Sequence, residues 1–185
     1  MHAAVALLLA LSAAETATEA LRGRDAEIRA ALPPDRQPMS DPERRRVESV
    51  LSQIVDTQAM LVGALGTHWN GLSPAQRKSL SDAFALRFRR SGGFRIESLR
   101  DARIEYLPES PRGDEVVVPT RVTVGEDRGE VTYVMRAGAQ GWRIVDIVTD
   151  DVSMVRNYGA RFARVLAQEG VEGLIRRLER TGDAR

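Results

Sequence analysis

The sequence is poor in the residues that metal sites and nucleophilic enzymes use most. It contains no cysteine and only two histidines among 185 residues. The absence of cysteine excludes disulfide bonds, thiolate metal sites and cysteine nucleophiles. His2 lies in an apolar leader, so His68 is left alone, whereas a catalytic triad or a multi-histidine metal site needs partners. We therefore expect no metal and no cofactor.

An excess of charge of either sign is also lacking. The 27 Lys and Arg residues nearly balance the 26 Asp and Glu residues, which gives a formal net charge of +1. No overall field therefore favours nucleic acid, and we expect no nucleic-acid partner. Basic clusters occur at 44–46, 87–90 and 176–177, each with apolar residues interleaved at core spacing. This pattern favours solvated helix faces over a docking surface.

Long apolar runs are missing except at the N-terminus. Residues 3–14 are small or apolar and uncharged, and Ser12-Ala13-Ala14 precedes Glu15. This pattern predicts a signal peptide at 1–14 that is cleaved after Ala14, and the alternative is a short buried helix. The run has about 12 apolar residues, whereas a bilayer span needs around 20. We expect residues 15–185 to form one domain.

Helical spacing of apolar residues dominates the first half of the chain. Residues 15–37 are compatible with a short outer helix that ends before Pro33-Pro34. Asp41-Pro42 predicts an N-cap and a first-turn proline for a helix that runs to Ile54 or Val55. Another helical face follows within 56–69, where Gly63 and Gly66 allow a second backbone to approach closely. Ser73, with Gln76 three residues later, is a capping-box pattern for a helix that carries Leu80, Phe84 and Phe88.

The helix that begins at Ser73 is expected to break at Ser91-Gly92-Gly93. Two glycines in a helix interior cost about 2 kcal/mol relative to alanine. Residues 94–99 are then expected to form a separate turn or short helix.

Period-two alternation replaces the helical spacing from residue 102 onward. It predicts strands at 102–106, 116–124, 131–135 and 142–148, joined by short turns. Pro119 cannot donate to a strand ladder, which suggests an edge position or a bulge. Helices before and after the strands indicate an α+β fold: a four-stranded antiparallel meander packed with N- and C-terminal helices.

The last predicted strand turns directly into a helix. From Trp142 to Val148 apolar residues fall on both faces, and the two charged residues are Arg143 and Asp146. Val155, Tyr158 and Phe162 then recur at helical spacing. Thr149, Asp150 and Asp151 carry oxygens able to cap the new helix. Gly170 is expected to stop that helix, and a final amphipathic helix follows it.

Several short motifs occur in an order that resembles one protein family. They are W-x-I-x-D-I-V from Trp142, D-x-V-S-M from Asp150, N-Y-x-x-x-F from Asn157 and E-G-V-E-G-L-I-x-x-L from Glu169. The earlier A-L-G-x-x-W and S-P-A-Q-R motifs fit the same order. From Arg44 to Leu178 the chain resembles MlaC-type proteins, also called toluene-tolerance auxiliary proteins, which are periplasmic phospholipid-binding components of an ABC lipid-transport system.

The resemblance implies a function in lipid transport. It implies a periplasmic, monomeric shuttle, not an enzyme, that binds phospholipid and exchanges it with an outer-membrane lipoprotein complex and an inner-membrane MCE-type component of the ABC transporter. The resemblance also implies that the sheet and the N- and C-terminal helices enclose an apolar cavity. Apolar residues on the inward sheet face and the facing helices are its candidate lining, although each would equally suit a dry core. The predicted lipid-binding residues are Leu65, Phe84, Phe88, Val118, Val122, Tyr133, Met135, Ile144, Met154 and Tyr158.

Two other classes of function remain open at this stage. One is an exported NTF2-like domain, a cone of helices on a curved sheet, that binds a ligand or uses Asp146, Asp150 or Asp151 for catalysis. Helix capping explains the Asp150-Asp151 pair without chemistry, so we predict no catalytic residue. The other is an interaction module with a dry core, or a hopanoid-associated relative within the same family.

Overall fold

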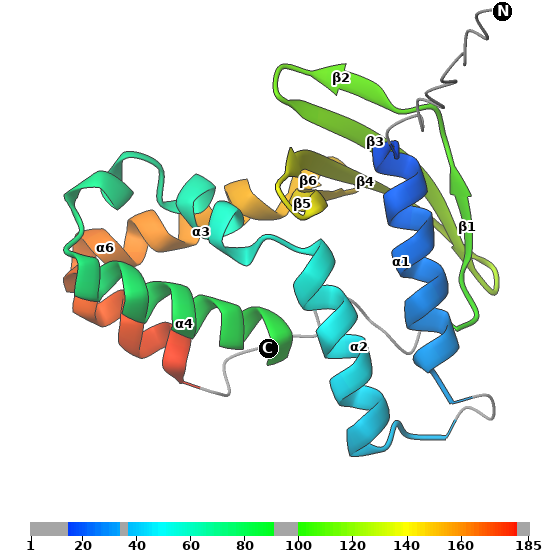
Figure 1. The fold of residues 1–185 in the computed structure, drawn as a ribbon. Helices are drawn as coiled ribbons and strands as arrows, with labels where there is room; N and C mark the ends of the chain where they lie inside the picture. Colours follow the sequence, from blue (N-terminus) through cyan, green and yellow to red (C-terminus); the bar gives the residue numbers. More distant parts are fainter. Residues whose placement is uncertain (1–14, 34–36, 91–99, 181–185) are drawn as a thin grey trace, which may run out of the picture.

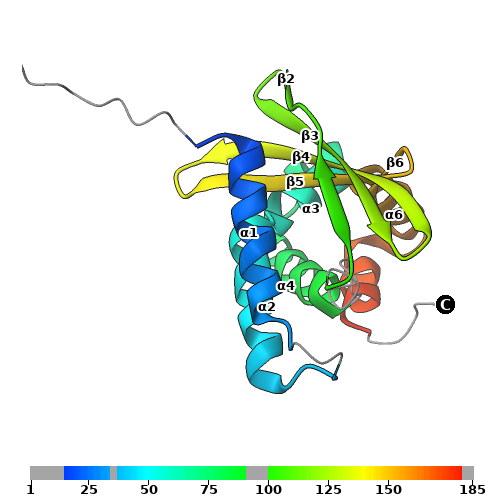
Figure 2. The ribbon, with the colours of Figure 1, turned by 90° about the vertical axis from the view of Figure 1, so that its right-hand side faces the viewer.

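The computed structural model describes residues 15–33, 37–90 and 100–180 (Figure 1). An antiparallel sheet curves around α1 (Ala17–Ala31), and α2 (Asp41–Ile54) runs beside α1 (Figures 1 and 2). The remaining helical elements are α3 (Thr57–Leu65), η1 (Gly66–Gly71), α4 (Pro74–Arg90) and α6 (Met154–Glu179). We call α3, α4 and α6 the helical lobe. The predicted α+β class is confirmed.

The sheet has six strands within the described residues, two more than predicted. The four expected strands are β1 (Arg103–Tyr106), β3 (Glu115–Val124), β4 (Asp127–Gly138) and β5 (Gly141–Thr149). The two short additions are β2 (Ser110–Arg112) and β6 (Val152–Ser153). The order is β1-β3-β4-β5-β6, with β2 beside β3, and all pairs are antiparallel. Strands of two or three residues are too short to show alternation, which is why the sequence pattern misses them.

The outer side of β5 is covered by more than one segment. Val148 and Thr149 pair with β6. Farther along the strand, Val55 forms a parallel bridge with Ile144, and the Asp56 N–H donates to the Ile144 carbonyl at 2.9 Å. The connection between α2 and α3 therefore continues the hydrogen bonding of the sheet.

Pro119 lies in a central strand, so its predicted edge or bulge position is wrong. β3 pairs with β4 on one side and with β1 and β2 on the other. The Pro119 carbonyl accepts from the Leu107 N–H at 2.9 Å, at the junction between β1 and β2. The nitrogen and carbonyl of one strand residue point to the same neighbour. The missing N–H therefore faces this junction and leaves the pairing with β4 intact.

Side-chain caps fix the starts of several helices. The capping box at Ser73 is confirmed, because the Gln76 N–H donates to Ser73 Oγ at 3.2 Å and the Ser73 N–H donates to Gln76 Oε1 at 3.1 Å. At α2 the cap is Ser40 with Glu43, and not the predicted Asp41, which is already the first helical residue. Ser40 and Asp41 are adjacent and can both cap a helix. Ser40 is the N-cap because Glu43, three residues later, completes a capping box with it.

The turn from sheet to helix uses different residues from those predicted. Asp150 and Asp151 have φ values of 47° and 63° and form the turn between β5 and β6. Asp tolerates this left-handed region better than most residues. The cap of α6 is Ser153, whose Oγ accepts from the Arg156 N–H at 3.1 Å, and Asp146 Oδ1 accepts from the Val155 N–H at 3.0 Å.

Glycines shape the packing of α6 in two places. A Cβ on Gly159 would lie 3.0 Å from the Ala64 carbonyl oxygen, and one on Gly63 would lie 3.0 Å from Val155 Cγ1. The backbones of α3 and α6 therefore approach closely at Gly159, whereas the atom nearest to Gly63 belongs to a side chain and not to the predicted second backbone. Gly66 ends α3 with φ 53°. Gly170 has φ 64° and ψ −169°, so the helix bends there as predicted and its last part returns beside α4 (Figure 1).

The apolar core has two parts. The main cluster joins the helical lobe, the start of α1 and the end of α2 to the inner face of the sheet. A smaller cluster lies between α1 and α2 and contains Ile28, Ala31, Leu32, Met39, Val47 and Val50. The predicted signal peptide and the predicted break at Ser91-Gly92-Gly93, with its following turn at 94–99, lie outside the described residues.

Candidate functional site

An apolar cavity of about 40 Å³ lies between the α1–α2 pair and the inner face of the sheet. Residues from both helices and from three strands form its wall. The lining residues are Leu21, Arg24, Asp25, Ile28, Leu51, Ile54, Ile104, Tyr106, Tyr133 and Ile144. Most of this wall is aliphatic or aromatic, so the cavity suits a hydrocarbon group better than a polar one.

Helical and strand periodicity together explain how these side chains meet. Leu21, Asp25 and Ile28 follow the i, i+4, i+7 spacing that places residues on one helix face. Ile104 and Tyr106 are two residues apart on β1 and therefore share one face of the sheet. The same face carries Tyr133 on β4, which is only 9% exposed.

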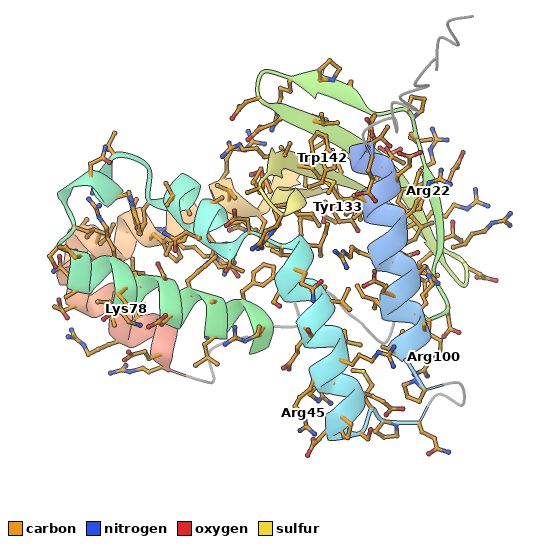
Figure 3. The ribbon with its side chains drawn as sticks, in the orientation of Figure 1. Arg22, Arg45, Lys78, Arg100, Tyr133 and Trp142 are labelled. Atoms are coloured by element: carbon orange, nitrogen blue, oxygen red, sulfur yellow. The ribbon has the colours of Figure 1, made fainter. Side chains whose placement is uncertain are left out.

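Charged groups lie at the α1 side of the cavity. Arg29 Nε pairs with Asp25 Oδ2 at 2.9 Å, and Arg24 Nη1 pairs with Glu27 Oε2 at 2.9 Å. The Arg22 guanidinium lies 4.6 Å from the centre of the Tyr106 ring. Figure 3 shows Arg22 projecting from α1 toward β1, with Tyr133 between α1 and the sheet. Arg22 forms no ion pair with any acidic residue in the described part of the chain, so its charge remains available to an anion.

The two tyrosines of the cavity wall keep their protons at physiological pH. Burial raises the pKa of Tyr133 to about 12, and the carboxylate of Asp25 adds to the effect. Burial also raises the pKa of Tyr106, again with a smaller contribution from Asp25. Both shifts arise because a phenolate loses its hydration in an apolar setting. The wall therefore stays uncharged on its sheet side.

The predicted lipid-binding residues divide between two regions. Tyr133 and Ile144 line the cavity, and Val118 and Met135 are fully buried on the same face of the sheet. Five others, Leu65, Phe84, Phe88, Met154 and Tyr158, belong to the helical lobe and contribute to the main core cluster. Their role in binding lipid stays a prediction.

Sequence reasoning missed the contribution of α1 and α2 to the cavity wall. Leu21, Ile28, Leu51 and Ile54 all line it. The spacing of Leu21 and Ile28 is a detectable signal, but the surrounding segment is rich in Ala, Arg and acidic residues and looks like an outer helix.

Val122 lies at a different depression, at the end of the sheet where β1, β3 and β4 meet. This groove measures about 890 Å³ and is lined by Arg103, Ile104, Glu105, Arg121, Val122, Thr123, Arg128, Gly129 and Glu130. Arg121 lies 3.7 Å from both Glu105 and Glu130. Such a charged wall does not suit acyl chains, so Val122 is a weaker candidate than Tyr133 or Ile144.

The acidic residues considered for catalysis have structural roles. Asp146 Oδ2 accepts from Ser153 Oγ at 2.6 Å, while its Oδ1 accepts from the Ile147 and Val155 N–H groups. The Asp150-Asp151 pair forms a strand turn. Within the described ranges, no group of three or more His, Asp or Glu side chains can hold a metal ion, and no helix has the length and apolar content to cross a membrane.

Comparison with known proteins places the chain in a family. A solved phospholipid-binding protein from Ralstonia solanacearum, determined in complex with a phospholipid, matches with a TM-score of 0.76 at 21% sequence identity. The match covers 86% of this chain and 93% of that protein, and it establishes a shared fold. The family model described as MlaC protein matches residues 29–180, which is most of the chain and includes the motifs that carry the resemblance. The chain therefore belongs to the MlaC protein family.

Proposed function

We propose that this protein is a periplasmic phospholipid carrier. The acyl chains enter between the α1–α2 pair and the sheet, and the head group stays near the charged residues of α1. The observation that carries this proposal is the apolar cavity with arginines at its α1 side. Membership of the MlaC family and the phospholipid complex of the R. solanacearum protein support it.

The size of the cavity means that its walls must move to admit a lipid. Pockets for small ligands measure roughly 300–1,000 Å³, whereas this cavity has about 40 Å³. The α1–α2 pair is suited to such movement because it has its own apolar cluster, which can stay packed while the pair shifts. The start of α1 is held to the sheet, where Trp142 Nε1 donates to the Glu15 carbonyl at 2.8 Å and the Thr18 N–H donates to Glu109 Oε2 at 2.7 Å. We infer that the far end of the pair swings away about this attachment.

Arg22 is the residue that we assign to the lipid phosphate. Its guanidinium already lies against a wall residue, Tyr106. The planar fork of arginine matches phosphate oxygens, and desolvation at the cavity edge strengthens that contact.

Energetics explain why a carrier of this kind needs no catalytic group. Two acyl chains with about 30 methylenes represent on the order of 24 kcal/mol of apolar burial at 0.8 each, so lipid free in water is scarce. Transfer from a bilayer to an apolar cavity changes the surroundings of the chains little. We propose that partners set the direction of this nearly balanced exchange by a monomeric shuttle: an outer-membrane lipoprotein complex and an inner-membrane MCE-type component of an ABC transporter.

Mass spectrometry of organic extracts from the purified protein tests the proposal. Stoichiometric phospholipid is expected. Hopanoid in its place would favour the hopanoid-associated relative, and an extract without lipid would contradict the carrier function.

A matched pair of variants tests the location of the lipid. Ile104→Asp places a carboxylate in the cavity wall, whereas Val117→Asp makes the same kind of change at a half-buried position on the opposite face of the sheet. We expect a several-fold loss of co-purified phospholipid in Ile104→Asp and little change in Val117→Asp, with both variants folded by circular dichroism. Equal lipid content in the two folded variants would show that the lipid lies elsewhere.

A further inference from the structure

Charge is unevenly distributed over this nearly neutral molecule. α4 contains five basic residues and one acidic residue, and α6 contains five basic and three acidic residues. Residues 103–153, which form the sheet, contain six arginines and ten acidic residues. The formal net charge of +1 thus hides a positive helical lobe and a negative sheet. Such a separation orients a protein in an external field even when its total charge is small.

The fold gathers part of the positive charge into one cluster. Arg87 Nη1 donates to the Arg180 carbonyl at 3.2 Å, so the ends of α4 and α6 are adjacent. Arg177 Nε donates to Glu169 Oε1 at 2.9 Å. Hydrogen bonding to Arg177 lowers the pKa of Glu169, and the charges of Arg176 and Arg180 act in the same direction. We call Arg87, Arg176, Arg177 and Arg180 the arginine cluster.

The bend of α6 at Gly170 creates this cluster. It turns residues 171–179 back beside α4, with Leu174, Ile175 and Leu178 buried and Arg176 and Arg177 on the exposed side. From sequence alone, 87–90 and 176–177 are predicted to be separate solvated helix faces. The structure brings the two basic segments together, although some 90 residues of chain separate them.

The surface around the cluster lacks the apolar anchors of a protein interface. Across the part of the chain that the structure describes, Val152 in β6, at 56% exposure, is the one large hydrophobic side chain that is exposed. Protein interfaces usually depend on a few buried aromatic or aliphatic side chains at their centre. Within the cluster, Arg87 is half-buried and Arg177 is paired with Glu169, whereas Arg176 and Arg180 are exposed. Exposed guanidinium groups of this kind are better matched to a diffuse layer of phosphates, as on an anionic bilayer.

We propose that the arginine cluster docks this protein on the surface of an anionic lipid bilayer. The exposed guanidinium groups of Arg176 and Arg180 contact the lipid phosphates, and the acidic sheet is repelled and faces away from the membrane. This docking is additional to lipid carriage and does not depend on the cavity being a lipid site. It would hold the protein at the surface where a carrier must load or unload.

Vesicle sedimentation with two charge-reversal variants tests the docking. The probe is vesicles of a zwitterionic phospholipid, alone or with one part in three of phosphatidylglycerol. Arg176→Glu with Arg180→Glu changes the cluster, and Arg103→Glu with Arg128→Glu makes the same change in net charge at exposed positions on the sheet. All three proteins share one N-terminus, so residues 1–14 contribute equally to each.

The expected result is a preference of the unaltered protein for the anionic vesicles that weakens as salt is added. A basic residue at an anionic surface contributes about fivefold to the partition coefficient, so the cluster variant should lose roughly 25-fold or more. The sheet variant should stay within about threefold of the unaltered protein. Circular dichroism and the phospholipid content of each purified protein, measured in parallel, separate a failure of docking from a failure of folding or of lipid carriage.

Three results would overturn the docking proposal. They are equal binding to neutral and anionic vesicles, equal loss in the two variants, and no vesicle binding by the unaltered protein. In the last case, capture of the cluster by an acidic protein partner would become the better explanation.

Discussion

The helical lobe and the α1–α2 pair pack in different ways against the same sheet. In the helical lobe, the ring of Phe84 lies 5.1 Å from Tyr158, 6.0 Å from Phe162 and 6.3 Å from Phe88 between ring centres. Gly159 brings the backbone of α6 against Ala64 of α3. This region has the close interlocking of an ordinary protein interior.

The α1–α2 pair is attached more loosely. The small apolar cavity lies between it and the sheet. The start of α1 and the end of α2 belong to the main core, whereas the far part of the pair has a separate apolar cluster of its own. This contrast supports our proposal that the α1–α2 pair, and not the helical lobe, moves to admit a lipid. Half of the residues predicted to bind lipid lie in the closely packed helical lobe, so α1 is the better place to test lipid binding.

Covalent closure of the cavity should have the largest effect on function. The chain has no cysteine, so Arg22→Cys with Tyr106→Cys provides the only two thiols, at positions whose native side chains touch. Joining them with a short bifunctional thiol reagent should nearly abolish exchange of fluorescent phospholipid with vesicles. The same double variant before linking is the control, because it already lacks Arg22. Exchange that continues at an equal rate after linking would show that α1 does not move.

A methyl group in each region should distinguish tight from loose packing. Gly159→Ala forces a Cβ to 3.0 Å from a carbonyl oxygen, and we expect the free energy of unfolding in urea to fall by about 1–3 kcal/mol. Gly23→Ala in α1 meets nothing within 4 Å, so better helix propensity should raise stability by about 0.5–1 kcal/mol. Loss of stability in both variants would mean that α1 is held as tightly as α6.

Alkaline pH should lower the free energy of unfolding through ionisation of Tyr133, and we expect this effect to be the smallest of the three. Tyr133 has a pKa of about 12 in the folded protein, raised by burial from 10.0, so the unfolded chain loses this proton first. Its contribution to stability is complete below about pH 9 and is lost as the pH rises from 10 to 12. Between pH 9 and 11 the unaltered protein should lose about 1 kcal/mol more than Tyr133→Phe in urea unfolding. Identical pH dependence of the two proteins would place Tyr133 in contact with water.

Local signals in the sequence predicted most of the fold. The Ser73 capping box, the four main strands and the break at Gly170 depend on neighbouring residues, and each is found where it was expected. The family resemblance, which depends on motif order, is confirmed by the match over residues 29–180.

Features that depend on distant residues were harder to predict. Asp150 and Asp151 have the composition of a cap but form a turn, because Ser153 and Asp146 are better placed to accept the first N–H groups of α6. The face of α1 that carries Leu21 and Ile28 can be recognised as a cavity wall only once the sheet is known to lie opposite to it. Residues of the cavity wall were therefore predicted on the sheet side, where strand alternation marks the inward face, and were missed on the side of α1 and α2.

The bridge between Val55 and Ile144 has a consequence for solubility. Unpaired strand edges recruit other chains, and a protein that must open its apolar interior is especially exposed to that hazard. Here the far side of β5 is occupied by Val55, by the Asp56 N–H and by β6, so that border is not offered to a second molecule. The proposed movement of α1 would leave this pairing in place, so that β5 stays protected from aggregation while a lipid enters.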